Sequence, residues 1–274
     1  GVAVLDTGIF LHRDFDSRVT GFADMVNRRN FAYDDCGHGT HICGIIGGSG
    51  RMSGGRYSGI APGCNLIMVK VLDRKGNGYS SDVLAGISWV LERKEQLGIR
   101  ILNISVGACS KRGMSENSAL VKGVNRAWDA GLVVVVAAGN NGPRTMSITT
   151  PGISRKVITV GCSDDDREVL VGGNRMVDYS GRGPTAACIC KPDLVAPGCS
   201  VVSCSSRADK YTIKSGTSMS TPIVSGAVAL LLERFPDMTN KDVKLRLRES
   251  SVDIGLPRNQ QGWGLLDVGK MIGK

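Results

Sequence analysis

Apolar residues along this chain fall into two kinds of segment that alternate with each other. Five short runs are almost continuously apolar, which is the pattern of a strand buried on both faces. These runs are Val2–Leu5, Leu66–Val71, Ile101–Ser105, Leu132–Ala138 and Val157–Val160. The segments Ser81–Leu97 and Ser115–Ala130 instead repeat apolar residues at helical spacing. Alternating strands and helices predict an α/β fold with a mainly parallel central sheet and helices on both faces.

The length of the chain, 274 residues, suits one large α/β domain. No linker, charge block or internal repeat divides it, so we assign residues 1–274 to a single domain. The longest apolar runs are well short of the roughly 20 residues that a membrane-spanning helix needs. No membrane partner is therefore expected.

The chain carries a formal charge of +9, but its basic residues are dispersed. Even the densest cluster, 241–248, alternates them with apolar and acidic residues, which is typical of a solvated helix face. Aromatic residues make up only 5%, too few for platforms that stack single strands. Nucleic acid is not an expected partner, while attraction to acidic protein segments stays open.

The nine cysteines form an odd set, so at least one thiol is free. Cys43 and Cys162 lie in apolar or glycine-rich sequence, where a reduced thiol packs as a small hydrophobe. This favours a reducing compartment and predicts a cytoplasmic protein, with secretion left open. Because no Cys-x2-Cys pair occurs and no histidine lies near Cys188–Cys204 in sequence, we expect no zinc site.

Ser218 lies in Gly216–Pro222, directly before the apolar run Ile223–Leu232. A serine at the start of a buried helix is near exposed amides and the positive end of the helix dipole, which favour negative charge on its side chain. On its own, such a serine is more often a helix cap than a nucleophile. Its partners elsewhere in the chain decide between the two interpretations.

A nucleophilic serine needs a base, and the base needs a group that orients it. Of the three histidines, His38 begins a predicted short helix and has glycines on both sides that leave its ring accessible. His41 is interpreted as structural and His12 as a solvated loop residue. Asp6, at the end of the first apolar run, is the candidate for the orienting carboxylate, although a turn aspartate is the simpler interpretation. An aspartic-protease interpretation of Asp6 fails, because the chain has no second Asp-Thr-Gly.

Asn140 follows the longest apolar run, in the turn Gly139–Gly142. A side-chain amide at this position can donate to an oxyanion beside the backbone amide of Ser218. In such a turn an asparagine commonly serves only to shape the backbone.

Taken together, these segments resemble the subtilisin-like serine proteases, the subtilases. The motifs occur in the order Asp, His, Asn, Ser, as in that family, and the similarity extends from residue 1 to about Asp267. The matching segments include 4–8, 38–41, 59–62, 69–72, 103–107, 137–140, 180–184, 191–198 and 216–222. The resemblance implies that Asp6 orients His38, that His38 is general base and then acid, and that Ser218 attacks. Asn140 would then help to hold the oxyanion.

The resemblance also implies a substrate pocket without charged walls, and therefore an apolar residue before the cut. The family's pocket maps onto these residues: Ser105, Val106, Gly107, Ala138, Gly139, Thr149 and Gly152. Two thiols, Cys36 and Cys43, are close to His38 in sequence, so a mercurial is expected to inhibit.

Many secreted subtilases bind calcium in a loop after the histidine helix. Here that loop, Gly47–Arg56, has no carboxylate and contains two arginines, so it serves a hard cation poorly. We expect no required metal or cofactor, with a weak structural calcium left open, and an intracellular-type subtilase. By resemblance, an inhibitory propeptide is expected upstream of residue 1.

Three functions are compatible with this family resemblance. The first is a serine endopeptidase that cleaves protein or peptide substrates through an acyl-enzyme. The second is a peptide transferase or macrocyclase of the same fold, which would usually carry inserted helices over the cleft. The third is a non-catalytic pseudoprotease that binds partners, against which the intact set of four residues argues.

Overall fold

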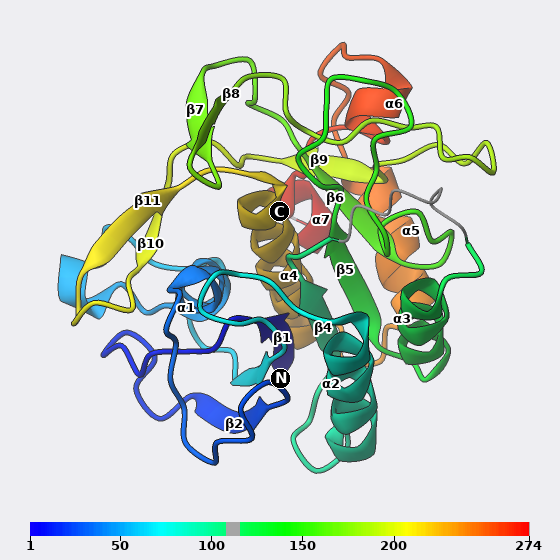
Figure 1. Ribbon diagram of the computed structural model, residues 1–274. Coiled ribbons are helices and arrows are strands. Elements are labelled where there is room, and N and C mark those ends of the chain that lie inside the picture. The colour runs from blue at the N-terminus through cyan, green and yellow to red at the C-terminus, as the bar shows by residue number, and fades with distance from the viewer. Residues whose placement is uncertain (108–115, 274) are drawn as a thin grey trace.

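A computed structural model describes residues 1–107 and 116–273 of the chain. At its centre is a seven-stranded sheet with the order β2-β3-β1-β4-β5-β6-β9, in which every neighbouring pair is parallel (Figure 1). The strands are β1 (Val2–Asp6), β2 (Val19–Asp24), β3 (Leu66–Lys70), β4 (Ile101–Ile104), β5 (Val133–Ala137), β6 (Ile158–Cys162) and β9 (Leu194–Ala196). The predicted parallel α/β fold is confirmed.

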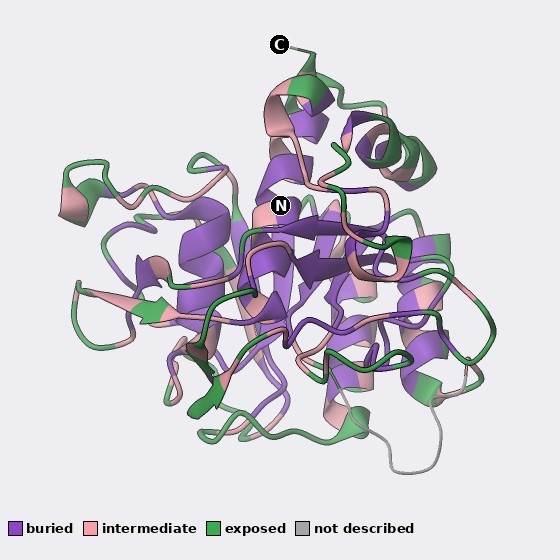
Figure 2. Ribbon diagram, turned by 90° about the horizontal axis from the view of Figure 1, so that it is seen from above, coloured by how far each residue is buried: buried purple, intermediate pink, exposed green. Residues whose placement is uncertain are grey.

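Helices cover both faces of this sheet. One face packs against α1 (His38–Gly47) and α4 (Thr217–Arg234), and the other against α2 (Ser80–Arg93) and α3 (Ala119–Asp129). Helix α4 is buried around most of its circumference, because it packs on strands β4, β5 and β6 and against α1, which covers β1 and β3 beside it. Viewed from above, the sheet and α4 form a continuous buried core, and exposed residues lie on the outer faces of the other helices and in loops (Figure 2).

The boundaries of two predicted helices differ from the observed ones. Helix α2 ends at Arg93, before the predicted Leu97, and α3 begins at Ala119. Ser118 caps α3, since its hydroxyl accepts a hydrogen bond from Val121 N at 3.3 Å. The predicted start of this helix, Ser115, lies outside the described residues.

The hydrophobic pattern does not predict the two edge strands β2 and β9, nor two antiparallel hairpins. The hairpins pair β7 (Val169–Val171) with β8 (Asn174–Met176), and β10 (Val201–Cys204) with β11 (Tyr211–Lys214). The second hairpin matters for the site, because β11 leads directly into the N-terminus of α4.

The C-terminal part of the chain adds α5 (Asn240–Ser250), α6 (Arg258–Gln261) and α7 (Val268–Ile272), and a 3-10 turn, Arg51–Ser53, follows α1. Helix α5 contains the basic cluster predicted to be a solvated helix face. Lys241 and Arg248 are exposed as predicted, whereas the side chain of Lys244 is only 18% exposed and lies 3.5 Å from Asp193. Of the helices that the structure describes, none combines the length and apolar character needed to cross a membrane.

Candidate active site

The topology of the sheet brings the candidate residues to one edge. Asp6 ends β1, Ser105 follows β4 and Asn140 lies three residues after β5, and these neighbouring parallel strands all point their carboxyl ends the same way. Helices α1 and α4 begin at this edge, and they carry His38 and Ser218 in their first turns (Figure 1). Residues separated by more than 200 positions in sequence therefore meet in one place.

Asp6 and His38 form a close pair. Asp6 Oδ1 lies 2.7 Å from His38 Nδ1 and accepts a second hydrogen bond from Thr7 N at 2.8 Å. The carboxylate is fully buried, whereas 23% of the His38 side chain is exposed. Gly37 precedes the helix with φ 86°, a left-handed conformation that glycine adopts at little cost. The bond to Asp6 fixes the tautomer of His38 and leaves Nε2 as its second ring nitrogen.

Charge around His38 favours its protonated form. Burial disfavours the imidazolium, but the carboxylate charge of Asp6 and its hydrogen bond outweigh this, so the pKa of His38 is raised above the ordinary histidine value. Asp34 contributes in the same direction, and the ammonium of Lys214 opposes it. The neutral base required for proton abstraction therefore forms only above this raised pKa.

Asp34 joins the two segments that carry this pair. Its carboxylate accepts hydrogen bonds from Thr7 Oγ1 at 2.9 Å and from Thr40 N at 2.9 Å. It also accepts the backbone amides of Cys36 and Gly37, at 3.1 and 2.8 Å. The loop after β1 and the start of α1 are thus fixed to the same side chain. This contact was not predicted from the sequence.

Ser218 points its hydroxyl away from the base in this structure. Its Oγ donates to the carbonyl oxygen of Ser105 at 2.7 Å, and no hydrogen bond joins it to His38 Nε2, although both residues are described. A rotation about the side chain of Ser218 would release it from Ser105. Nucleophile–base hydrogen bonds are often long or misaligned in unliganded enzymes, so this rotamer is compatible with a nucleophilic role.

Thr217 holds Asn140 in a defined orientation. Asn140 Oδ1 accepts hydrogen bonds from both Thr217 N and Thr217 Oγ1, each at 3.0 Å. The same hydroxyl accepts from Gly139 N at 3.2 Å. With its oxygen occupied in this way, the side chain of Asn140 presents its amide NH₂ as the remaining donor group. Thr217 is a second residue of the site that the sequence analysis did not single out, although it directly precedes Ser218.

A cavity of about 450 Å³ contains these groups. His38, Asn140 and Ser218 line it, together with five of the predicted pocket residues: Ser105, Val106, Gly107, Gly139 and Thr149. Two others, Ala138 and Gly152, are buried and do not line it. Thr149 packs tightly against Gly107 and Gly139, since a methyl group added at either glycine would overlap its side chain. These close contacts make the two glycines part of the pocket's shape.

The two thiols near His38 have different environments. Cys36 lines the same cavity as His38 and is partly exposed. Cys43 is fully buried, and burial raises its pKa well above the ordinary cysteine value. Only Cys36 is therefore accessible to a reagent that enters the cavity. The expected inhibition by a mercurial therefore depends on Cys36, and Cys43 packs in the core as its apolar sequence indicates.

His12 was predicted to be a solvated loop residue, and this prediction is wrong. The ring is 1% exposed, with Nδ1 accepting from Asp14 N at 3.1 Å and Nε2 donating to Lys210 O at 3.1 Å. Its polar sequence neighbours gave no indication of this, because the covering segment includes Tyr211, almost 200 residues further along the chain.

Two groups of potential metal ligands occur among the described residues, and hydrogen bonds within the protein already occupy both. In the first, His12, Asp14 and Cys204, the Asp14 carboxylate accepts the hydroxyl of Tyr211 at 2.6 Å. The second consists of Cys162, Asp164 and Cys199. There Asp164 Oδ1 accepts the backbone amides of Gly198 and Cys199, at 2.7 and 3.1 Å. Neither group lies in the cavity with His38.

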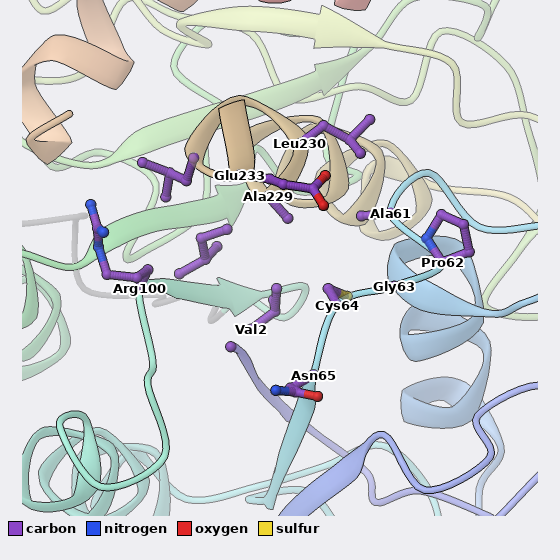
Figure 3. A pocket seen from close by; sticks show the side chains of 13 residues that line it. Val2, Ala61, Pro62, Gly63, Cys64, Asn65, Arg100, Ala229, Leu230 and Glu233 are labelled. Carbon is purple, nitrogen blue, oxygen red and sulfur yellow. The ribbon is translucent and has the colours of Figure 1, made fainter. Parts of the chain in front are cut away.

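A second cavity, of about 490 Å³, lies at the amino ends of the strands (Figure 3). Val2 and Arg100 border it on the sheet side, and Ala229, Leu230 and Glu233 of α4 border it on the other. Its walls are largely apolar, and no candidate catalytic residue contributes to them. The size of a cavity therefore does not identify the site in this protein.

The parallel sheet brings the Asp6–His38 pair, Asn140 and Ser218 to one edge, which is the arrangement that the resemblance to the subtilases predicts. The chain belongs to the subtilase family, whose model matches residues 1–264. Among curated relatives it is 43% identical over 267 residues to serine protease AprX of Bacillus subtilis (strain 168), with 91% of this chain covered. It is 33% identical over 269 residues to subtilisin DY of Bacillus licheniformis, with 97% of this chain and 88% of that protein covered.

The chain spans 60% of the length of AprX and 66% of the length of a thermostable alkaline protease of Halalkalibacterium halodurans. Solved structures of the same fold include Sphericase, with a TM-score of 0.81 and 30% identity over 98% of this chain and 91% of that one. A cold-adapted subtilisin-like serine proteinase aligns with a TM-score of 0.77 and 29% identity, over 97% of this chain and 86% of that one. The predicted family resemblance is confirmed.

Proposed function

We propose that this protein is a serine endopeptidase that hydrolyses peptide bonds through an acyl-enzyme. The observation that carries the proposal is the arrangement of His38, Ser218 and Asn140 around one cavity, with the buried carboxylate of Asp6 bonded to the base. Membership of the subtilase family supports it. Similar proteins are described as serine proteases and subtilisins.

In the proposed mechanism, the Ser218 hydroxyl leaves the Ser105 carbonyl and transfers its proton to His38 Nε2 as Oγ attacks the substrate carbonyl carbon. Asp6 stabilises the imidazolium that forms, and the Asn140 amide and Ser218 N donate to the oxyanion. His38 then protonates the leaving amine. Water attacks the acyl-enzyme with His38 again as the base, which restores Ser218. These roles are the known ones of the family, carried over to the matching residues.

The lining of the cavity favours a substrate with an apolar side chain directly before the cleaved bond. Val106 and the glycines Gly107 and Gly139 contribute no charge to its walls, and Thr149 closes the gap between the glycines. Burial of an apolar side chain there would stabilise the complex by about 25 cal/mol per Å².

No metal or cofactor enters this mechanism. Near the loop after α1, Asp16 lies 3.5 Å from the cation of Arg51, and the Asp14 carboxylate accepts Met52 N at 2.9 Å, so both acids already have partners within the protein. Eight described cysteines are free thiols, which supports a reducing, cytoplasmic environment. An inhibitory propeptide is also proposed, and its only support is the resemblance to the family.

The proposed activity is tested on a mixed pool of peptides, with the products identified by mass spectrometry. An endopeptidase yields fragments with free carboxyl and amino ends, and Ser218→Ala yields none. Products joined to new partners or closed into rings would instead support a peptide transferase. An intact pool, with a folded protein that binds the peptides, would support a non-catalytic role.

A further inference from the structure

The wall of the active-site cavity next to His38 carries a positive charge. Lys214, the last residue of β11, lines this cavity together with His38 and Cys36. Burial raises the pKa of Cys36 and Asp6 raises that of His38, and the nearby ammonium of Lys214 opposes both increases. Four positions separate Lys214 from Ser218, so its place in the cavity depends on the same segment that positions the candidate nucleophile.

The hairpin that carries Lys214 is fixed firmly to α1. Lys214 pairs with Val201 across the two strands, and the ring of His41 contacts the carbonyl oxygens of Val201 and Thr212 at 3.1 and 3.2 Å. Ser203 Oγ donates to His41 O at 2.9 Å. Burial lowers the pKa of His41 to about 3, so this ring stays neutral and keeps its structural contacts. The backbone of Lys214 is therefore held at a defined place in the wall of the cavity that His38 also lines.

This charge has no counter-ion within the cavity. No aspartate or glutamate is among the described residues that line it, and Lys214 forms no ion pair with any carboxylate in the described part of the chain. The other lining cation is Lys75, in the loop after β3 beside Leu72 and Gly76. A bound substrate could thus supply the carboxylate that Lys214 lacks.

The proposed mechanism determines which end of a substrate lies near Lys214. The residue before the cut occupies the pocket between 105–107 and 139–140. His38 must reach the leaving amine to protonate it, so the residues after the cut pass along the His38 side of the cavity. Cys36 and Lys214 border that side, whereas Lys75 lies beside Leu72 and Gly76 in the loop after β3. The leaving group and Lys214 therefore share one end of the site.

We propose that Lys214 is a specificity-determining residue, and that it selects substrates with an acidic side chain at one of the first two positions after the cut. The inference rests on the proposed endopeptidase function. A partly exposed ion pair contributes little binding free energy, so the expected preference for an acidic residue over a neutral residue of the same shape is about two- to fivefold in kcat/KM. Because salt screens exposed charges, the preference decreases as ionic strength rises.

The test uses internally quenched peptides that share one sequence before the cut. After the cut they carry Asp or Asn at the first or the second position, with neutral residues elsewhere. Rates are compared at a pH on the alkaline plateau of the pH–rate profile, where His38 is neutral and its protonation no longer affects the rate. We expect the Asp peptide of one pair to be cleaved about two- to fivefold faster at low salt, with a smaller difference in about 1 M NaCl, where the Debye length is about 3 Å.

Three variants assign the effect to Lys214. Lys214→Gln brings the Asp/Asn ratio close to one, and Lys214→Glu brings it below one. Lys210→Gln is the matched control: it removes the same charge from the same hairpin at an exposed residue outside the cavity, so the ratio stays as in the wild type. Lys75→Gln also leaves this ratio unchanged.

Equal cleavage of Asp and Asn peptides at low salt would overturn the inference, and so would a preference that persists in Lys214→Gln. In either case, cleavage of the Asn peptides would leave the endopeptidase function intact. If no peptide is cleaved by the wild-type protein, the proposed function itself fails.

Discussion

Replacing Thr217 by valine tests how Asn140 is held for catalysis. The change keeps the shape of the side chain but deletes one of the two hydrogen bonds to Asn140 Oδ1, which spans 3.0 Å from Thr217 Oγ1. It also removes the hydroxyl that accepts from Gly139 N at 3.2 Å. The remaining bond, from Thr217 N, is a backbone contact that the substitution leaves in place.

The size of the effect follows from the value of one hydrogen bond. A neutral hydrogen bond contributes about 0.5–1.5 kcal/mol net, and 1.36 kcal/mol corresponds to a tenfold change in rate. If the lost bond counts fully in the transition state, kcat falls about two- to thirteenfold. KM changes little, because the Asn140 amide acts mainly on the oxyanion. The unpaired Gly139 N lowers the free energy of unfolding by about 1–3 kcal/mol.

The assay is steady-state cleavage of one peptide, with urea unfolding measured on the same preparations. Thr217→Ser retains the hydroxyl and is expected to restore kcat. Thr221→Val is the matched control, because it deletes a buried hydrogen bond from Thr221 Oγ1 to Thr217 O at 2.8 Å without touching Asn140. Its kcat should stay within about twofold of the wild type.

A double-mutant cycle shows whether Thr217 acts through Asn140. In an Asn140→Leu background, Thr217→Val should no longer lower kcat, since there is no side-chain amide left to orient. The reasoning is refuted if Thr217→Val lowers kcat by the same factor in both backgrounds, or if it raises KM while kcat stays constant.

Three further predictions concern the surroundings of the base and the pocket. A mercurial should inhibit reversibly through Cys36, so Cys36→Ser should be resistant and Cys43→Ala as sensitive as the wild type; full activity of the wild type in saturating mercurial would remove Cys36 from the site. The value of kcat/KM should fall at acid pH as His38 is protonated, with a midpoint above the ordinary histidine pKa. Lys214→Gln should move this acid limb to higher pH, because it removes a positive charge that opposes the rise in the pKa of His38. An acid limb that moves to lower pH would contradict the electrostatic assignment. A peptide library should select apolar residues directly before the cut, and strong selection of charged residues there would contradict a pocket closed by Thr149 and two glycines.

The sequence predicts the interior of the sheet well because its strands are long and apolar. Val133–Ala137 is buried at every position, and a short run that is apolar throughout is typical of a strand buried on both faces of a parallel sheet. The edge strand β9 has only three residues and lies between prolines 192 and 197, and β2 has mostly half-buried residues. Their local patterns do not distinguish them from loops.

The candidate catalytic residues could be proposed from the sequence because each lies at or just after the end of a strand, or in the first turn of a helix. Residues that support them are harder to find, because their roles depend on contacts between distant segments. Asp34 contacts Thr7 across 27 positions, and Thr217 contacts Asn140 across 77. Lys214 could not be placed beside His38 without the pairing of β10 with β11, which short strands of mixed polarity do not reveal.

The most direct test of the account is covalent labelling by a sulfonyl fluoride, followed by mass-spectrometric identification of the labelled residue. Only a serine activated by a neighbouring base reacts quickly, so we predict a single adduct on Ser218, formed more slowly in Asp6→Asn and not formed in Ser218→Ala. An adduct on another serine, in a Ser218→Ala protein that still cleaves peptides, would contradict the assignment of Asp6, His38 and Ser218 as the catalytic triad.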